Sequence, residues 1–355
     1  MKKKCLITGG AGFIGCSLSH KVSTQFDRII VFDNLHPQIH KKHERPKELE
    51  NRVELVEGDI TNSSDWDKVL YKFCPDTVIH LAAETGTGQS LTESTRHAST
   101  NVVGTTQMLD AFVRNNTFPS EVLLTSSRAI YGEGIWKRIN DGALFYPGQR
   151  SDQQLKEGIW DFPGAEHLAF SAQKNCPRPT SVYGATKLAQ ENILSSWASS
   201  FNVPYKIVRL QNVYGPGQSL VNSYTGIVSL FVQIAKAGNS IPLYEDGQML
   251  RDFVFIDDVT DAIIRVLDND IAIGQIFDIG SGISSTIAQV ASIISNRYHS
   301  PDPHICGKYR NGDIRHASCD CTPILSSLGW KAKWNLNDGL KQLCDWIDNE
   351  MEKRE

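Results

Sequence analysis

A tyrosine and a lysine stand four residues apart in the segment YGATK, as Tyr183 and Lys187. In a helix this spacing places both side chains on one face. A neighbouring ammonium stabilises a phenolate and so lowers the pKa of a tyrosine towards working pH. Tyr183 is therefore a candidate general base, with Lys187 as its electrostatic partner. Such pairs are also common on ordinary helix surfaces, so the assignment depends on what surrounds this one.

A serine in the segment TSSRAIYG, which runs from Thr125 to Gly132, is the third candidate. The segment ends a predicted strand, and sheets built from alternating strands and helices hold their ligands at the carboxyl ends of strands. A hydroxyl there can bond to a reacting oxygen and pass a proton towards Tyr183. We assign Ser127, with Ser126 as the alternative. A serine that only ends the strand is the simpler interpretation.

A glycine-rich segment, LITGGAGFIG from Leu6, separates the first predicted strand from the first predicted helix. Its glycines allow a tight turn and let backbone amides approach a pyrophosphate at the helix N-terminus. The second predicted strand ends at Asp33, where a carboxylate accepts hydrogen bonds from an adenosine ribose and repels a 2'-phosphate. Together these features predict NAD rather than NADP as cofactor.

The elements that must position these residues alternate along the first half of the chain, in the pattern of strand-helix-strand units and a parallel sheet. The predicted strands are Lys4–Thr8, Arg28–Asp33, Val53–Glu57, Thr77–Leu81, Glu121–Ser126 and Tyr205–Leu210. The predicted helices are Phe13–Val22, Thr100–Arg114 and Tyr183–Phe201. We predict an α/β fold with a Rossmann-type doubly wound parallel sheet.

The pattern changes after Leu210, where glycine, proline, asparagine and serine punctuate the chain before a predicted helix over Thr225–Ala237. Phe255–Leu267 and Gln275–Gly280 predict a helix and a strand that return to the large sheet. We expect residues 1–211 and about 253–298 to form an NAD-binding domain. Residues 212–252 and 299–355 would form a smaller, discontinuous, mixed α/β lobe for the substrate.

Composition excludes several classes of partner. The 355 residues are 40% hydrophobic, and 36 basic and 40 acidic residues give a net charge of -4. No basic excess would attract nucleic acid or an anionic membrane. No apolar run reaches the roughly 18 residues of a membrane span, and the short apolar run after the first lysines is no signal peptide. We expect a cytoplasmic protein with a small-molecule partner.

The eight cysteines are expected to be reduced thiols rather than a disulfide framework. One group of residues has side chains of the type that binds zinc: His304, Cys306, His316, Cys319 and Cys321. It contains no CxxC pair and fits no common zinc spacing, so we predict no metal.

Seven segments in order, from near Leu6 to about Asp320, resemble the extended short-chain dehydrogenase/reductase family, specifically its NAD-dependent nucleotide-sugar epimerases and dehydratases. They are TGGAGFIG, HLAA, SSRAIYGEG, YGATK, NVYGPGQ, EDGQMLRDFVFIDDV and RNGDIRH. The resemblance implies that tightly held NAD removes a hydride from a sugar carbon and leaves a keto-sugar. Return of the hydride to the other face inverts the centre.

The resemblance also implies the lining of the site. The residues at NAD would be Gly9, Gly12, Phe13, Ile14, Gly15, Asp33, Asn34, Asp59, Ile60, Leu81, Ala82, Ala83 and Asn101, with Tyr183 and Lys187 at its ribose or nicotinamide. The sugar would meet Thr85, Thr87, Ser127 and Tyr183, with Glu84 near it. The nucleotide diphosphate and ribose would be held by Asn212, Arg251, Arg310 and Asp313. Tyr244 would stack on the base, unless it is a core aromatic residue.

The family's dehydratases carry an Asp-Glu pair directly after the catalytic Ser or Thr, because elimination of water needs an additional acid and base. Arg128 and Ala129 stand there in this chain, which argues against dehydration. Epimerisation, expected at C4 through a 4-keto intermediate, and net oxidoreduction remain. An NAD-sensing protein without catalytic activity is the alternative from another class.

Three segments, His36–His40, Gly86–Ser90 and Asn222–Gly226, most resemble 4-epimerases of deoxythymidine-diphosphate (dTDP) 6-deoxyhexoses such as L-rhamnose. Epimerases of UDP-hexoses or UDP-uronates stay open. The usual destination of such products in bacteria is a surface polysaccharide, for example lipopolysaccharide. Related enzymes dimerise through two helices, here Thr100–Arg114 and Tyr183–Phe201, so we expect a homodimer.

Overall fold

The computed structural model describes residues 3–40, 42–220 and 226–353. At its centre is a seven-stranded sheet in the order β13-β9-β5-β4-β1-β2-β3, with every pairing parallel. The strands are β1 (Lys4–Thr8), β2 (Arg28–Asp33), β3 (Glu54–Glu57), β4 (Thr77–His80), β5 (Glu121–Ser127), β9 (Tyr205–Leu210) and β13 (Ile276–Ile279). The strand order reverses between β1 and β4, which is where open α/β sheets bind ligands. The predicted Rossmann-type fold is confirmed.

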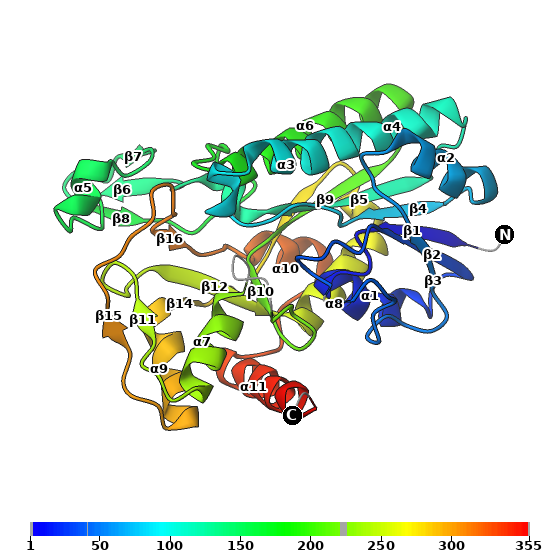
Figure 1. Cartoon of the computed structure of the whole chain (residues 1–355). Coiled ribbons are helices and arrows are strands. Elements are labelled where there is room, and N and C mark those ends of the chain that lie inside the picture. The colour runs from blue at the N-terminus through cyan, green and yellow to red at the C-terminus, as the bar shows by residue number, and fades with distance from the viewer. Residues whose placement is uncertain (1–2, 41, 221–225, 354–355) are drawn as a thin grey trace.

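Helices cover both faces of this sheet (Figure 1). One face carries α2 (Ser63–Lys72), α4 (Gly104–Arg114) and α6 (Val182–Phe201), whose apolar side chains share a core with Leu6 of β1. The other carries α1 (Phe13–Val22), α8 (Ile256–Leu267) and α10 (Thr322–Leu328), which share a core with Ile7. Neighbouring strand residues thus enter opposite cores, and this explains why the strands are continuous apolar runs.

The predicted helix over Thr100–Arg114 is wrong as a single α-helix. The chain instead forms α3 (Ser94–Ala98), a π-helical turn over Ser99–Val103, and then α4. Asn101 lies in this π-helical turn, and its side chain forms hydrogen bonds with Glu84 and Thr186. These partners are distant in the sequence, so the local spacing of apolar residues does not reveal the turn. The other predicted elements of the large sheet agree with the structure to within one residue.

The smaller lobe is built around α7 (Ile227–Lys236), α9 (Ile287–Tyr298) and α11 (Leu336–Glu352), which share one core. Its short strands are β10 (Asn212–Tyr214), β11 (Pro242–Leu243), β12 (Leu250–Phe255), β14 (Ser284–Thr286), β15 (His304–Ile305) and β16 (His316–Ala317). Helix α9 packs on α7, although it falls within the span 253–298 that the sequence assigns to the large domain. The predicted start of this helix, Thr225, and the motif residues Asn222–Thr225 lie outside the described residues. The domain boundaries stay a prediction.

Between β5 and α6 the chain forms a three-stranded antiparallel sheet that the sequence did not predict. It consists of β6 (Trp136–Arg138), β7 (Leu144–Phe145) and β8 (Ala165–His167), with α5 (Asp152–Lys156) beside it. This insertion projects at one end of the molecule, next to β16 (Figure 1). Ion pairs join it to the smaller lobe: Arg150 lies 2.9 Å from Glu245 in a buried pair, and the buried Arg315 lies 3.1 Å from the half-exposed Asp161. Within the described part of the chain, no helix is long and apolar enough to cross a membrane.

Candidate active site

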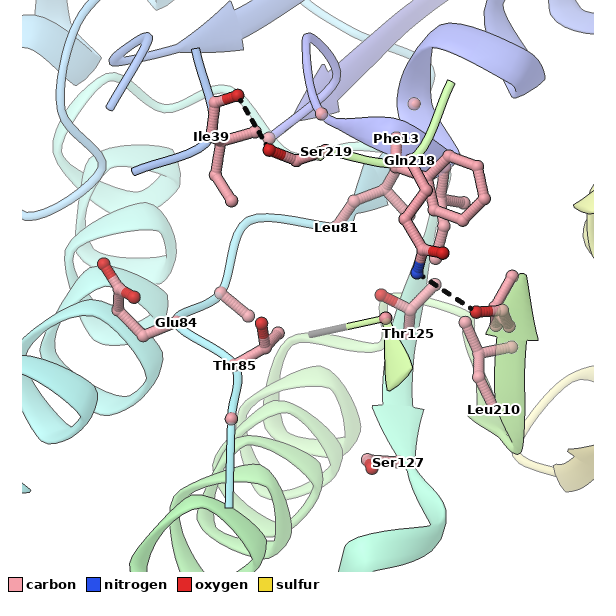
Figure 2. Close-up of a pocket in the computed structure, with 18 of the residues that line it drawn as sticks. Phe13, Ile39, Leu81, Glu84, Thr85, Thr125, Ser127, Leu210, Gln218 and Ser219 are labelled. Atoms are coloured by element: carbon pink, nitrogen blue, oxygen red, sulfur yellow. Dashed lines mark hydrogen bonds between the residues drawn. The ribbon is translucent and has the colours of Figure 1, made fainter. Parts of the chain in front are cut away.

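A cavity of about 680 Å³ lies at the carboxyl ends of the central strands and extends to the smaller lobe. Figure 2 shows how segments from both parts of the chain surround it. Most residues predicted for the site line it: Gly9, Gly12, Phe13, Ile14, Gly15, Asp33, Asn34, Ile60, Leu81, Ala82, Ala83, Thr85, Thr87, Ser127, Tyr183, Lys187, Asn212, Arg251, Arg310 and Asp313. Their individual roles towards cofactor or substrate stay predictions.

The glycine loop fits a pyrophosphate. Gly9 has a φ of +65°, and a Cβ at this position would lie 2.6 Å from the backbone of Ala82, so no other residue fits there without a shift. Gly12 is the N-cap of α1 and supplies no side chain to the first backbone N–H groups of that helix. These N–H groups remain available to an anion at the positive end of the helix.

Asp33 is fixed at the wall of the cavity by two backbone donors. The N–H of Ala11 donates to its Oδ2 at 3.0 Å, and the N–H of Leu35 donates to its Oδ1 at 2.9 Å. Burial raises the pKa of this carboxyl group, and the nearby imidazole of His40, 3.9 Å away, opposes the rise. A carboxylate has four lone-pair sites, so two bonds leave capacity for a ribose diol. The arrangement fits NAD.

Three predicted contact residues do not line the cavity. The carboxylate of Asp59 bonds to Asn34 and Thr61, so it supports the wall from behind. Asn101 is fully buried and holds both backbone polar groups of Glu84. The ring of Tyr244 lies beneath the guanidinium of Arg310, 5.0 Å from it, and so supports a predicted phosphate ligand.

The reacting groups predicted from the sequence come together. Ser127 ends β5, and Tyr183 and Lys187 occupy the first turns of α6. The Oγ of Ser181 accepts from the N–H of Gly184 at 3.0 Å and caps this helix, while the Oγ of Ser90 accepts from the N–H of Tyr183 at 3.0 Å. These bonds fix the start of α6 against the loop after β4.

Electrostatics at this centre differ in part from the expectation. Burial raises the pKa of Tyr183, while a hydrogen bond with Ser127 and the charge of Arg128 lower it. Burial lowers the pKa of Lys187 to about 7, and Glu191 opposes that change. The charge of Arg128 therefore acts on the phenol in this structure, and the role of Lys187 as its electrostatic partner stays a prediction.

Arg128 is a residue whose functional potential the sequence analysis missed. It lines the cavity directly after Ser127, and its Nε donates to the Oδ1 of Asn212 at 2.7 Å. Burial lowers its pKa to about 9. The signal in the sequence is the basic residue that directly follows the candidate serine.

Arg251, predicted as a phosphate ligand, uses both of its Nη atoms in hydrogen bonds with the protein backbone. Its Nη1 donates to the carbonyl oxygens of Leu250 at 2.7 Å and Arg315 at 3.1 Å, and its Nη2 donates to that of Ile314 at 2.8 Å. Arg251 therefore holds the segment that follows Asp313. Glu84 turns away from Ser127 (Figure 2), and its carboxylate pairs with Arg96 at 2.7 Å.

Two segments that are distant in the sequence meet at the edge of the cavity. The hydroxyl of Ser219 donates to the carbonyl oxygen of Ile39 at 3.3 Å, as Figure 2 shows. The segment after β10 thus contacts the segment after β2.

The residues considered as zinc ligands do not form one site. His304 bonds to Ser240, and His316 bonds to Asp161. Cys319 and Cys321 approach Asp252, with all three ligand atoms within 4.8 Å. The carboxylate of Asp252 already accepts bonds from Ser281 and Gly282, so we assign no metal there.

Residues 5–280 match the family model described as "NAD dependent epimerase/dehydratase family". A protein of Burkholderia thailandensis named dTDP-L-rhamnose 4-epimerase is 53% identical over 352 residues, which cover 99% of this chain and 97% of that protein. The crystal structure of UDP-glucose 4-epimerase with UDP-glucose from Thermotoga maritima is similar at a TM-score of 0.80 and 25% identity, over 98% of this chain and 99% of that one. The structure of MoeE5 in complex with UDP-glucuronic acid and NAD is similar at 0.76 and 25%, with the same coverage.

Proposed function

Since this chain belongs to the NAD dependent epimerase/dehydratase family, we propose that it inverts C4 of a nucleotide-diphosphate sugar and that this sugar is a dTDP-linked 6-deoxyhexose such as dTDP-L-rhamnose. The observation that carries the proposal is the convergence of Ser127, Tyr183 and Lys187 on the cavity that the glycine loop enters. The relative from Burkholderia supports the choice of nucleotide, sugar and carbon, because its identity extends over nearly the whole of both chains.

The residues at this centre suit proton transfer at a sugar hydroxyl. Burial disfavours the phenolate of Tyr183, while the hydrogen bond with Ser127 and the charge of Arg128 favour it. In this form Tyr183 accepts the proton of the C4 hydroxyl, and Ser127 donates a hydrogen bond to the same oxygen while C4 becomes a carbonyl carbon. Bound NAD would supply the acceptor, and then the donor, of the hydride at C4. After the sugar has turned in the cavity, Tyr183 returns its proton to the oxygen. Atoms and electrons balance without an added oxidant.

The cofactor is held by the features described above. The N–H groups at the start of α1 would bind the pyrophosphate, and Asp33 would accept from the adenosine ribose. Lys187, which is 2% exposed and lines the cavity from α6, would bind the nicotinamide ribose. The identity of these contacts is part of the proposal.

Two further expectations belong to it. The chain forms a homodimer through α4 and α6, which lie side by side in Figure 1. These helices, the π-helical turn before α4 and the loop after it expose Val103, Val113, Phe118 and Phe201. The enzyme is cytoplasmic, because all eight cysteines are free thiols, as is usual in a reducing compartment.

The test is incubation of the purified protein, without added reductant, with a panel of dTDP- and UDP-sugars, followed by proton NMR of the ring protons. Interconversion of two C4 epimers with no net NADH supports the proposal and names the substrate. Loss of water from the sugar, or accumulation of NADH, would replace it with dehydration or net oxidoreduction. Bound NAD without turnover of any sugar would favour the sensor.

A further inference from the structure

Arg128 lacks a charged partner, whereas three of the four buried arginines among the described residues form ion pairs and the fourth, Arg251, donates to backbone carbonyls. Arg150, Arg209 and Arg315 each lie within 3.0 Å of a carboxylate, that of Glu245, Glu191 and Asp246 respectively. Arg128 has no ion-pair partner among the described residues, and its one hydrogen bond goes from Nε to the neutral amide of Asn212. A half-buried charge without a counter-ion is costly unless a ligand supplies the missing acceptors.

The free end of this guanidinium belongs to the cavity. Nε is the nitrogen that Asn212 holds, so the four N–H groups on the two Nη atoms have no acceptor in the described part of the chain. Arg128 lines the cavity next to Ser127 and acts electrostatically on Tyr183 and Asp313. Its donors are therefore close to the carbon whose hydroxyl Ser127 and Tyr183 would bind.

Two neighbouring side chains also have polar atoms without a hydrogen-bond partner among the described residues. Gln211 is 5% exposed and Ser126 is 4% exposed, and both line the same cavity. Among the described residues, neither atom of the Gln211 amide nor the Ser126 hydroxyl has a hydrogen-bond partner. Ser126 is the next-to-last residue of β5 and Gln211 follows β9, and these strands pair so that Ser127 lies opposite Leu210. Buried polar groups are nearly always bonded, so this wall is built for a polar ligand.

We propose that Arg128, oriented by Asn212, is a substrate-binding residue that donates from its Nη atoms to oxygen substituents of the sugar, with Gln211 and Ser126 completing the same subsite. The inference deepens the proposed function, on which it rests. A planar group with parallel donors suits two adjacent oxygen atoms. Because Arg251 is occupied by backbone carbonyls, Arg128 is the more available cation near the reacting carbon.

The experiment measures the affinity of Arg128→Gln and wild-type protein for dTDP-L-rhamnose and for free dTDP, by isothermal titration calorimetry of the holoenzyme. The affinity for the nucleotide sugar is expected to fall by about 10- to 100-fold, as for loss of a hydrogen bond from a charged group. The affinity for dTDP is expected to stay within about twofold, because the missing donors face the sugar. Arg128→Lys should recover only part of the loss, since an ammonium has no planar fork.

The matched control is Arg138→Gln, which removes an exposed arginine paired with Asp141 and should leave both affinities unchanged. Bound NAD and the melting temperature of each variant report that the fold is kept. An equal loss of affinity for dTDP and for the sugar would overturn the proposal by making Arg128 a phosphate ligand. Unchanged affinity for both would also overturn it. A wild-type protein that binds dTDP-L-rhamnose without epimerising it would refute the proposed function alone, because the comparison of affinities needs no turnover.

Discussion

Glu191 accepts two hydrogen bonds from the guanidinium of Arg209, at 2.7 and 3.0 Å, and lies one helical turn beyond Lys187 on α6. Both side chains of the pair are 4% exposed. Arg209 also donates to the hydroxyl of Tyr131 at 2.8 Å, and this hydroxyl donates to Asp278. The helix that carries the predicted general base is thus tied to the sheet by a buried chain of charges.

Removal of one partner should leave the other charge buried and unpaired. Glu191→Ala is expected to lower the free energy of unfolding by about 3 to 5 kcal/mol, measured by urea denaturation. Glu166→Ala, which breaks an exposed pair with Lys137, should change it by less than about 1 kcal/mol. Similar losses in both variants would contradict the importance of the buried pair.

Tyr183→Phe removes the proposed proton acceptor and little else. Turnover of the nucleotide sugar should fall by about 10²- to 10⁴-fold, as for loss of general base catalysis. Bound NAD, measured after denaturation, should remain. Tyr71→Phe, at a side chain that is 83% exposed, is the control and should behave as the wild type. Full turnover by the Tyr183 variant would refute its catalytic role.

Lys187 should make stability depend on pH. Burial lowers its pKa from the usual 10.5 to about 7, so the folded protein binds fewer protons than the unfolded chain between these values. The free energy of unfolding therefore rises with pH between about 7 and 10.5. Below pH 7 the charged, buried Lys187 destabilises the fold to its full extent. The melting temperature of Lys187→Met should therefore be higher than that of the wild type at pH 6. The difference between the two melting temperatures should be smaller at pH 9. A difference that is constant with pH would contradict the low pKa.

Asp33→Asn places an amide donor against one of two backbone N–H groups, so it should disturb the adenosine ribose site. The affinity for NAD is expected to fall by about 10- to 100-fold in titrations of cofactor-free protein. Asp67→Asn is the matched control, because Asp67 forms an exposed ion pair with Arg114 and does not line the cavity, and it should leave the affinity unchanged. Unchanged affinity of the Asp33 variant would contradict a contact between Asp33 and the cofactor.

The exposed apolar side chains beside α4 and α6 should be covered in a dimer. The wild type is expected to sediment as a dimer, and the double variant Val113→Arg/Phe201→Arg as a monomer. Ile271→Arg changes a more exposed apolar side chain, on the short helical turn Asp270–Ala272, and should leave the dimer intact. A wild-type monomer would remove the basis of this prediction.

Local signals predict the large domain well. Apolar runs between glycine or proline punctuation predict strands because both faces of the sheet are buried, as the opposite directions of Leu6 and Ile7 illustrate. The glycine loop and Asp33 are recognisable because a tight turn and a ribose contact need particular residue types. Helices such as α6 have enough turns for their periodicity to be visible.

The remainder depends on contacts between distant segments. The π-helical turn around Asn101 reflects bonds to Glu84 and Thr186, which no local pattern contains. The commitment of Arg251 to the carbonyls of residues 314 and 315 likewise arises from strand pairing across 64 positions of the chain. Arg128 was visible in the sequence, but its lack of a counter-ion is a property of the folded cavity.

The charged contacts of the insertion over β6–β8 limit how its neighbourhood can be redesigned. Arg150 and Glu133 belong to the insertion, whereas Glu245, Asp246 and Arg315 belong to the smaller lobe, and Glu133 accepts from the backbone N–H of Arg315. A chimera that exchanged only residues 133–170 with a relative would leave several of these charges without partners. Engineers who wish to transfer substrate preference within the family therefore need to transplant the insertion and its partner segments from the same parent.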